Sequence, residues 1–261
     1  MRREISIITI CFNNLDELIK TCKSVDFQNE PPYEHLIIDG SKNVEIKKYL
    51  ESNLQPNYRK WICEPDNGIA DAFNKGVKNC DGDIIQFLNS ADCFYNENAL
   101  KKVNEAFNKS KNITWLHGKQ YLKRGGEWVI IGKTFESKKL YRGMRSVFHQ
   151  TMFVNKSLFE KYGLFDTSLK IAMDYDFVLR LKNEPFYFLP EILVSFDPGG
   201  ISNTNYLESL EEIKKCYNKR YGKSYKLIAW QWRLKVLNFL LQSKIGIILF
   251  NIKRKLNLEN F

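Results

Sequence analysis

Short apolar runs alternate with amphipathic stretches along the N-terminal part of the chain. The predicted strands lie near residues 4–11, 34–39, 59–63 and 83–88, and the predicted helices near 14–25, 43–52 and 68–79. Asn14, followed by Asp16 and Glu17, is typical of the N-cap and acidic first turn of a helix. This alternation predicts βαβ units and a largely parallel sheet.

The pattern changes after a further predicted helix near 96–108. Residues 113–131 are typical of a β-hairpin that turns at residues 124–126, Arg-Gly-Gly. More strands are predicted at 149–154 and 186–196, and a charged helix at 208–221. Because no internal repeat or low-complexity linker interrupts the chain, we expect two halves fused into one globule.

The last stretch, residues 225–258, interleaves aromatic and aliphatic side chains with Lys and Arg. Its apolar runs are far shorter than the ~20 residues that a membrane-spanning helix needs. Trp230 and Trp232 beside basic residues favour a helix that lies on an acidic membrane surface. The alternative is a helix that packs on the protein's own core or on a second subunit.

The net charge of +10 indicates an anionic partner. Nucleic acid, a nucleotide diphosphate and an acidic membrane surface all fit that charge. The chain has no helix-turn-helix, zinc-finger or RNP-type pattern, and its basic residues concentrate toward the C-terminus. These features count against nucleic acid and favour the membrane.

The six cysteines are scattered without a CxxC pair, which argues against a disulfide scaffold or a metal cluster and fits a reducing cytosol. The N-terminal sequence MRREISIITI starts with basic residues, but its apolar run is short and mixed with polar residues. It also lacks a small-residue cleavage site, so we interpret it as the first strand rather than a signal peptide.

The segment from Glu64 to Asp92 combines a turn, a helix, an apolar strand and a polar loop. Asn89, Ser90 and Asp92 follow directly after the strand. Because ligands bind in open α/β sheets at the carboxyl ends of the strands, we expect this loop to lie at the ligand site. A carboxylate there can hold a divalent cation against phosphate oxygens, so this order of elements predicts a nucleotide-diphosphate site.

Four sequence blocks point to a known family. They are ISIITICFNN at 5–14, HLIIDGSK at 35–42, EPDNGIADAFNKGVKNCDGDIIQFLNSAD at 64–92 and HQTMFVNKSLFEKYGLFDTSLKIAMDYDFVLRL at 149–181. In this order and at these separations they resemble the family 2 inverting glycosyltransferases of the GT-A fold. The likeness is greatest to the bacterial branch that builds cell-surface polysaccharides, and it covers residues 4 to about 203.

The resemblance implies an α/β protein with the GT-A fold, in which a Rossmann-like, mostly parallel central sheet is flanked by helices. Residues 1–205 would form the glycosyltransferase domain. Its nucleotide-sugar-binding half would span residues 1–95, and its acceptor-binding and catalytic half residues 96–205. Residues 206–261 would form a C-terminal basic amphipathic helical extension.

The resemblance assigns the nucleoside to the ends of the first two strands. Thr9 would lie beside the base, and Asp39 would accept a hydrogen bond from a base N–H. The alternative is that Asp39 and Gly40 simply form a turn. Asp66 and Gly68 would lie over the base or the ribose. The full set of implied nucleotide-binding residues is Thr9, Cys11, Asn13, Asp39, Asp66, Gly68, Lys75 and Ser90.

Members of this family carry a metal-binding acidic motif where this chain has Asn89-Ser90-Ala91-Asp92. Ser90 and Ala91 replace acidic residues of many relatives, so only Asp92 remains. A single carboxylate, with diphosphate oxygens and waters, can still hold Mg²⁺ or Mn²⁺. The resemblance therefore implies a divalent cation bound by Asp92. The alternative is that Asp92 is the N-cap of the helix near 96–108.

Asp174 aligns with the catalytic base of the family. An inverting transfer needs one base, which takes the proton of the acceptor hydroxyl as the oxygen attacks the anomeric carbon. Asp176, two residues later, would point elsewhere on a helix, which implies an acceptor-binding or structural role. Arg180 either returns toward the phosphates or pairs with Asp176 at i,i+4.

His149 precedes an apolar strand, and the family branch often has the same His-Gln pair at this place. A neutral imidazole can donate a hydrogen bond to a sugar hydroxyl or a diphosphate oxygen, or it can be a structural histidine that bridges strands. The segment at 197–202 resembles a loop near the active site in this branch. Its adjacent glycines make it either a mobile lid or a turn.

The resemblance thus implies an inverting glycosyltransferase that moves a sugar from a nucleotide diphosphate donor, with UDP-sugars first among the candidates. The acceptor would be a hydroxyl of a lipid-linked saccharide in capsule, O-antigen or exopolysaccharide assembly. The protein would act in the cytoplasm, peripheral on the inner face of a bacterial membrane. The alternatives are a nucleotide-sugar-binding protein with little or no turnover and a basic nucleic-acid-binding protein.

Overall fold

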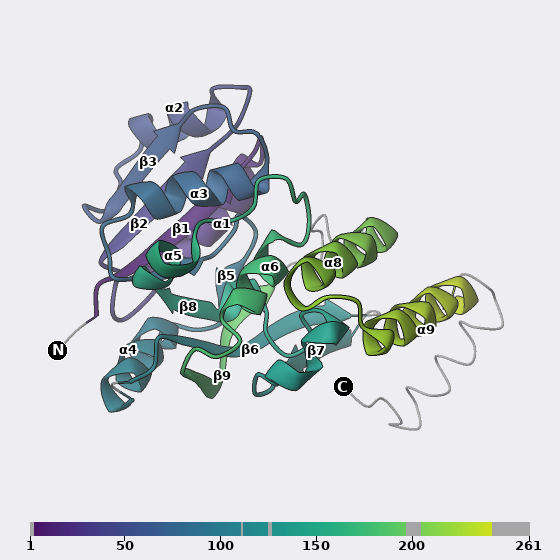
Figure 1. Ribbon diagram of the computed structural model, residues 1–261. Coiled ribbons are helices and arrows are strands. Elements are labelled where there is room, and N and C mark those ends of the chain that lie inside the picture. The colour runs from purple at the N-terminus through teal and green to yellow at the C-terminus, as the bar shows by residue number, and fades with distance from the viewer. Residues whose placement is uncertain (1–2, 111, 125–126, 197–204, 242–261) are drawn as a thin grey trace.

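The computed structural model describes residues 3–110, 112–124, 127–196 and 205–241 (Figure 1). Within these ranges nine strands form one sheet in the order β3-β2-β1-β4-β8-β6-β9-β5, and β7 pairs with β6. Helices pack on both faces of this sheet. The protein is therefore a layered α/β structure, as the sequence pattern predicts.

The N-terminal half is built from parallel βαβ units. Its elements are β1 (Ile5–Cys11), α1 (Leu15–Asp26), β2 (Glu34–Asp39), α2 (Glu45–Ser52), β3 (Arg59–Cys63), α3 (Ile69–Asn79) and β4 (Ile84–Phe87). β1 is parallel to both β2 and β4, and β2 is parallel to β3. Every residue of β2 and β4 is buried, because helices cover both faces of the sheet. The predicted elements of this half are confirmed to within a few residues.

The C-terminal half of the sheet has mixed pairing. Its elements are β5 (Cys93–Phe94), α4 (Ala99–Lys109), β6 (Trp115–Arg124), β7 (Glu127–Ile131), the 3₁₀ helices η1 (Ser137–Arg142) and η2 (His149–Thr151), β8 (Met152–Asn155), α5 (Ser157–Tyr162), α6 (Met173–Arg180) and β9 (Phe186–Phe196). β8 is antiparallel to β4 and β6, whereas β9 is parallel to β6 and antiparallel to β5. The predicted hairpin is present as β6 and β7.

The strand predicted at 149–154 is only partly correct. Residues His149–Thr151 form the 3₁₀ turn η2, and the strand begins at Met152. The turn closes because the Thr151 N–H and its hydroxyl both donate to the carbonyl of Phe148, each at 2.9 Å. His149 therefore lies in a turn that precedes β8 and not within the strand.

Two large apolar clusters fill the space between the sheet and its helices. On one face α3, α5 and α6 cover the strands, and the rings of Phe73 and Phe87 lie 4.4 Å apart. On the other face Phe107 of α4 lies in the cluster that contains Phe153 of β8. Burying such a side chain contributes about 1.5–3 kcal/mol. The sheet is therefore held rigidly from both sides, which fixes the positions of the loops at its edge.

Two expectations about helix caps need correction. Asn14 occupies the N-cap position of α1, but its side chain does not cap the helix. Instead, its Oδ1 accepts the Phe12 N–H and its Nδ2 donates to Ser90 Oγ. The alternative that Asp92 caps the next helix is wrong, because α4 begins at Ala99 with Asn98 at its N-cap position.

The chain ends, in its described part, with α8 (Tyr206–Tyr221) and α9 (Tyr225–Leu241). The glycine-containing segment predicted at 197–202 lies outside the described residues. One stripe of α9, formed by Leu227, Gln231 and Leu234, is buried against the protein, so packing on its own core is confirmed for this face. A second stripe is exposed, and it contains Ile228, Trp232 and Phe239. Within the described ranges, none of the helices has the length and apolar character that a bilayer crossing requires.

Candidate active site

The carboxyl ends of the parallel strands meet at one edge of the sheet. The strand register places Cys11 opposite Asp39, and Asp39 opposite Cys63. The loop after β4 joins them, because the Ser90 N–H donates to the carbonyl of Ile10 at 3.2 Å. This edge brings together the segments that the sequence assigned to the nucleotide.

The loops after β1 and β2 are tied to each other. The Ser41 N–H donates to Asp39 Oδ1 at 3.0 Å, and the Asn13 N–H donates to Ser41 Oγ at 2.7 Å. Asn13 has a φ of 53°, in the left-handed region that Asn tolerates better than most residues. The turn that the sequence offered as an alternative at Asp39 is therefore present. Base recognition by Asp39 stays a prediction.

Thr9 and Cys11 lie beneath the surface of this edge. Thr9 is fully buried, and its hydroxyl donates to the carbonyl of Leu88 at 2.7 Å and lies 2.9 Å from His35 Nε2. Burial lowers the pKa of His35, so this ring is neutral. Burial also raises the pKa of the Cys11 thiol, so it is not a thiolate. These side chains form the floor below the loops.

The loop after β3 closes onto the loop after β2 through a glycine. A Cβ atom at Gly40 would lie 1.8 Å from Asp66 Oδ2, so only glycine permits this approach. Asp66 Oδ1 accepts the N–H of Gly68, which has a φ of 111° and precedes α3. Lys75, on α3, pairs with Glu64 at 3.1 Å. Asp66 and Lys75 thus lie on one loop-helix unit beside Asp39.

The loop after β4 is a tight turn. Ser90 Oγ accepts a hydrogen bond from Asn14, and the Asp92 N–H donates to the carbonyl of Asn89 at 3.0 Å. Ala91 has a φ of 80°, a left-handed conformation that costs a non-glycine residue about 1–2 kcal/mol. Asp92 is 4% exposed. The strained turn places Asn89, Ser90 and Asp92 around one bend at the edge of the sheet.

His149 connects this bend to the predicted base. Its Nε2 lies 3.2 Å from Asn89 Nδ2, and its Nδ1 lies 3.3 Å from Asp174 Oδ2. One ring nitrogen of His149 thus faces the amide of Asn89, and the other faces the carboxylate of Asp174. The other carboxylate oxygen of Asp174 accepts the Tyr175 N–H in the first turn of α6. The side chains of His149 and Asp174 are 23% and 25% exposed, so solvent reaches both.

Aromatic rings pack beside His149 and Asp174. His149 and Asp174 line a cavity together with apolar side chains that include Phe73, Phe165 and Phe177. The Phe73 ring lies 6.1 Å from the imidazole. The packed rings therefore cover one side of the contact between His149 and Asp174.

Asp176 and Arg180 lie in a separate, mostly buried ion cluster. Asp176 pairs with Arg180 at 3.2 Å and with Arg220 of α8 at 3.4 Å. The sequence left two roles open for Arg180, and the i,i+4 pair with Asp176 is thus confirmed. Arg180 also donates to the carbonyls of Tyr162, Gly163 and Leu164. Both side chains have intramolecular partners, which join α6 to α8 and to the end of α5.

The sequence places Asn89 in the loop expected at the ligand site but gives it no specific role, whereas the structure brings its Nδ2 within 3.2 Å of His149 Nε2. Its Oδ1 is buried and accepts no hydrogen bond within the described residues. The available signal was its position as the first polar residue after a buried strand at the ligand-binding edge. Asn89 therefore joins the candidate site.

In the described part of the chain, no group of three or more His, Cys, Asp or Glu side chains is arranged to hold a metal ion. The donors at the expected place are Asp92 and the buried Oδ1 of Asn89. Mg²⁺ and Mn²⁺ accept carboxylate and amide oxygens, and Mg²⁺ usually keeps several waters or substrate oxygens. These two residues fit a cation that is held largely by substrate phosphates.

Comparison with known proteins defines the class. Residues 6–163 match the model of the glycosyl transferase family 2. An uncharacterized glycosyltransferase of Mycobacterium tuberculosis strain H37Rv is 35% identical over 203 residues, which cover 76% of this chain and 77% of the relative. Fold and sequence together define a glycosyltransferase. The chain belongs to glycosyltransferase family 2, which confirms the prediction from its motifs.

Solved structures confirm the predicted fold. The crystal structure of S. aureus TarS has a TM-score of 0.63 at 16% identity and covers 86% of this chain. This chain spans only 41% of that TarS chain. The mannosyltransferase PcManGT from Pyrobaculum calidifontis has a TM-score of 0.64 at 14% identity. This match covers 100% of this chain and 82% of the PcManGT chain.

Proposed function

We propose that the protein is an inverting glycosyltransferase that transfers a hexosyl or N-acetylhexosaminyl group from a nucleotide diphosphate sugar to a saccharide hydroxyl. The main support for this proposal is the contact between His149 and Asp174. His149 also contacts Asn89, which belongs to the loop after β4. UDP-sugars are the first candidate donors. TarS is known in complex with UDP-GlcNAc, and PcManGT in complex with GDP-Man and Mn²⁺, which supports a nucleotide-sugar donor here.

Asp174 serves as the base in this proposal. The acceptor oxygen attacks the anomeric carbon while the bond from that carbon to the diphosphate oxygen breaks. The proton of the hydroxyl passes to a carboxylate oxygen of Asp174, and the electron pair leaves with the nucleoside diphosphate. Attack opposite the leaving group inverts the anomeric centre. His149 and the Tyr175 N–H hold the two carboxylate oxygens, so the base is oriented before the substrate binds.

The nucleoside is proposed to lie on the loops after β1, β2 and β3. Asp39 and Asp66 can accept hydrogen bonds from the base or the ribose, and Gly68 allows the backbone to come close. Asn13, Lys75 and Ser90 are the further candidate contacts, with Thr9 and Cys11 forming the floor. The divalent cation is assigned to Asp92 and Asn89, and when bound it would neutralise the charge that develops on the leaving diphosphate.

The acceptor is proposed to be lipid-linked, in the assembly of capsule, O-antigen or exopolysaccharide. The supporting feature is α9, whose exposed stripe carries Trp232 at 70% and Phe239 at 74% exposure, beside basic Arg233. We assign the protein to the inner face of a bacterial cytoplasmic membrane, with residues 1–95 binding donor, 96–205 binding acceptor and 206–261 contacting lipid.

The experiment that tests the function is a thermal-shift panel, followed by a transfer assay. UDP, GDP, dTDP and their common sugars are tested with Mn²⁺, Mg²⁺ or EDTA, because a ligand that binds only the folded state raises Tm. We expect a metal-dependent rise with one nucleotide. A rise without sugar transfer or sugar-nucleotide hydrolysis would favour a binding protein. No rise with any nucleotide, together with salt-sensitive retention on nucleic acid, would favour a nucleic-acid binder.

A further inference from the structure

A carboxylate from α8 holds the chain where it enters α6. Glu212 Oε1 accepts the Lys170 N–H at 2.9 Å. Its Oε2 accepts the N–H groups of Ile171 and Ala172, each at 2.8 Å. Successive backbone N–H groups that converge in this way form a small concave site for an anion. Here the anion is a side chain of the protein itself, which lies at least 40 residues further along the chain.

This contact fixes the start of the helix that carries the proposed base. Ala172 occupies the N-cap position of α6, and its side chain makes no cap hydrogen bond. Asp174 follows two residues later, in the first turn. Because Glu212 holds three N–H groups directly before this turn, it sets where the turn begins. It thereby sets where Asp174 lies relative to His149, which comes from another element.

Further contacts join α8 to α6, and the two helices lie side by side (Figure 1). Arg220 pairs with Asp176 at 3.4 Å, in the middle of α6. The Tyr221 hydroxyl donates to the carbonyl of Leu179 at 2.7 Å, near the end of α6. These contacts hold the middle and the end of α6, and the carboxylate of Glu212 holds the segment before its beginning.

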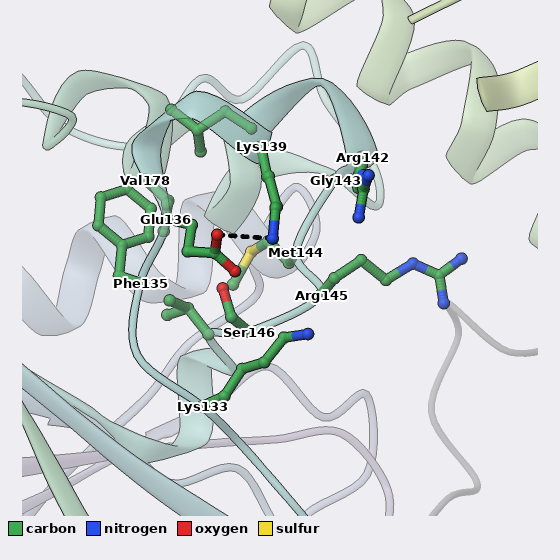
Figure 2. Close-up of a pocket in the computed structure, with 12 residues that line it drawn as sticks. Lys133, Phe135, Glu136, Lys139, Arg142, Gly143, Met144, Arg145, Ser146 and Val178 are labelled. Carbon is green, nitrogen blue, oxygen red and sulfur yellow. Dashed lines mark ion pairs between the residues drawn. The ribbon is translucent and has the colours of Figure 1, made fainter. Parts of the chain in front are cut away.

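The packing between α6 and η1 is less complete. The Tyr175 hydroxyl donates to the carbonyl of Leu140 at 2.7 Å. Leu140 and Val178 also line a pocket whose other walls come from residues 133–147 (Figure 2). The space between the lining atoms is about 410 Å³, with the open mouth included. Because this space borders α6, the contacts with α8 contribute more to fixing the position of the helix.

We propose that Glu212 is a positioning residue for the transfer, which holds residues 170–172 so that Asp174 faces the acceptor hydroxyl. The inference rests on the proposed function, because the position of a base matters only for a transferase. It also assigns α8 to the catalytic half, which ends at residue 205 in the proposed division of the chain. A displacement of a reacting group by about 1 Å can lower a rate about 10²-fold.

The variant Glu212→Gln tests the proposal. It keeps the length of the side chain but replaces one acceptor oxygen with an amide group that cannot accept an N–H, so at least one of the three hydrogen bonds is lost. We expect kcat and kcat/KM for transfer to fall together, by at least about ten-fold. UDP affinity, measured by calorimetric titration, should equal that of the wild type, because the nucleoside is assigned to other loops.

The matched control is Glu208→Gln. Glu208 is an exposed carboxylate of the same helix, one turn before Glu212, and it accepts a hydrogen bond from the side chain of Asn205. This variant should transfer sugar at the wild-type rate. If Glu212→Gln does not fold, Glu212→Asp takes its place. Its shorter side chain cannot reach all three N–H groups, so the same fall in kcat is expected.

A double-mutant cycle separates positioning from a general loss of structure. In an Asp174→Asn background no base remains to be positioned, so adding Glu212→Gln should change the residual single-turnover rate by less than about two-fold. An equal loss in both backgrounds would overturn the proposal. A wild-type kcat in Glu212→Gln, or a loss of UDP affinity that parallels the loss of rate, would also overturn it.

The same measurements distinguish a failure of this proposal from a failure of the proposed function. A wild-type rate in Asp174→Asn, or no transfer by the wild type, would reject the proposed function and the role of Glu212 with it. If Asp174→Asn is slow while Glu212→Gln is as active as Glu208→Gln, only the role of Glu212 is rejected.

Discussion

Nδ1 of His149 lies 3.3 Å from Oδ2 of Asp174, although the two residues come from separate elements, η2 and α6. Asn89 approaches the opposite ring nitrogen of His149. The contact therefore joins the end of β4, where the donor is proposed to bind, to the first turn of α6. Because the Tyr175 N–H holds the second oxygen, Asp174 is oriented by protein groups on both sides.

Replacing Asp174 with Asn keeps the shape of the side chain but removes the base. We expect the rate of transfer to fall by about 10²–10⁴-fold, the range of general-base catalysis. The Tm increase caused by the nucleotide should stay within error, since Asp174 lies away from the nucleoside loops. Initial rates of sugar transfer and thermal shift with UDP measure the two effects.

The matched control for this prediction is Asp81→Asn. Asp81 is an exposed carboxylate that pairs with Lys60, outside the candidate site. This variant should transfer sugar at the wild-type rate. If Asp174→Asn were as active as the control, another group would have to be the base.

Gly40→Ala should weaken nucleotide binding. The new Cβ would lie 1.8 Å from Asp66 Oδ2, so the Asp66 side chain must move and give up its hydrogen bond to the Gly68 N–H. A lost hydrogen bond of this kind costs about 1–2 kcal/mol, which corresponds to an affinity about five- to thirty-fold lower. Calorimetric titration with the nucleotide that stabilises the wild type measures the change.

A double-mutant cycle shows whether this effect acts through Asp66. In an Asp66→Ala background the clash is absent, so adding Gly40→Ala should change the affinity little. Equal losses in both backgrounds would mean that Gly40 itself contacts the nucleotide, and our account of the close approach would be incorrect.

The N-terminal half of the fold was predictable because its local sequence patterns match the elements that form. Each buried strand is a short apolar run, and each intervening helix has one apolar face, so positions were correct to within a few residues. The segment at His149 was harder to predict. Its sequence suits a strand, but hydrogen bonds to the Phe148 carbonyl close a 3₁₀ turn there instead. A tertiary contact supports this turn, because Gln86 Nε2 donates to the carbonyl of Gln150.

The candidate site was predictable as a set of residues but not as a set of contacts. Asp174 and His149 stand out through their motifs, whereas their contact depends on β8 inserting between β4 and β6. Asp176 shows the same limit. Its pair with Arg180 follows from helical spacing, but its second partner, Arg220, comes from α8 and has no local signature.

His117 should make the folded state less stable as the pH falls from about 6.5 to about 4. Burial lowers the pKa of this ring to about 4, so the unfolded chain binds a proton in this window and the folded chain does not. The full effect is about 3 kcal/mol. It is absent above pH 6.5 and complete below pH 4. Urea unfolding at a series of pH values measures it.

The variant His117→Phe tests this assignment. The ring packs against Trp115 and Phe188, and neither nitrogen makes a hydrogen bond within the described residues, so Phe suits the site. The variant should lose less stability than the wild type between pH 6.5 and 4. Buried His35 keeps a contribution of the same sign, so some slope remains. Parallel curves for both proteins over this range would contradict the prediction.

The exposed stripe of α9 should bind anionic membranes. Trp232 and Phe239 face solvent, whereas Leu227 and Leu234 of the same helix are buried, so Trp232→Ser with Phe239→Ser removes apolar surface without disturbing the packed side. Co-sedimentation with phosphatidylcholine vesicles containing phosphatidylglycerol should fall by at least about ten-fold. Trp128→Ser, at a tryptophan of β7 that is 55% exposed, should bind as the wild type does. Equal binding by the α9 variant and this control would show that another surface meets the membrane.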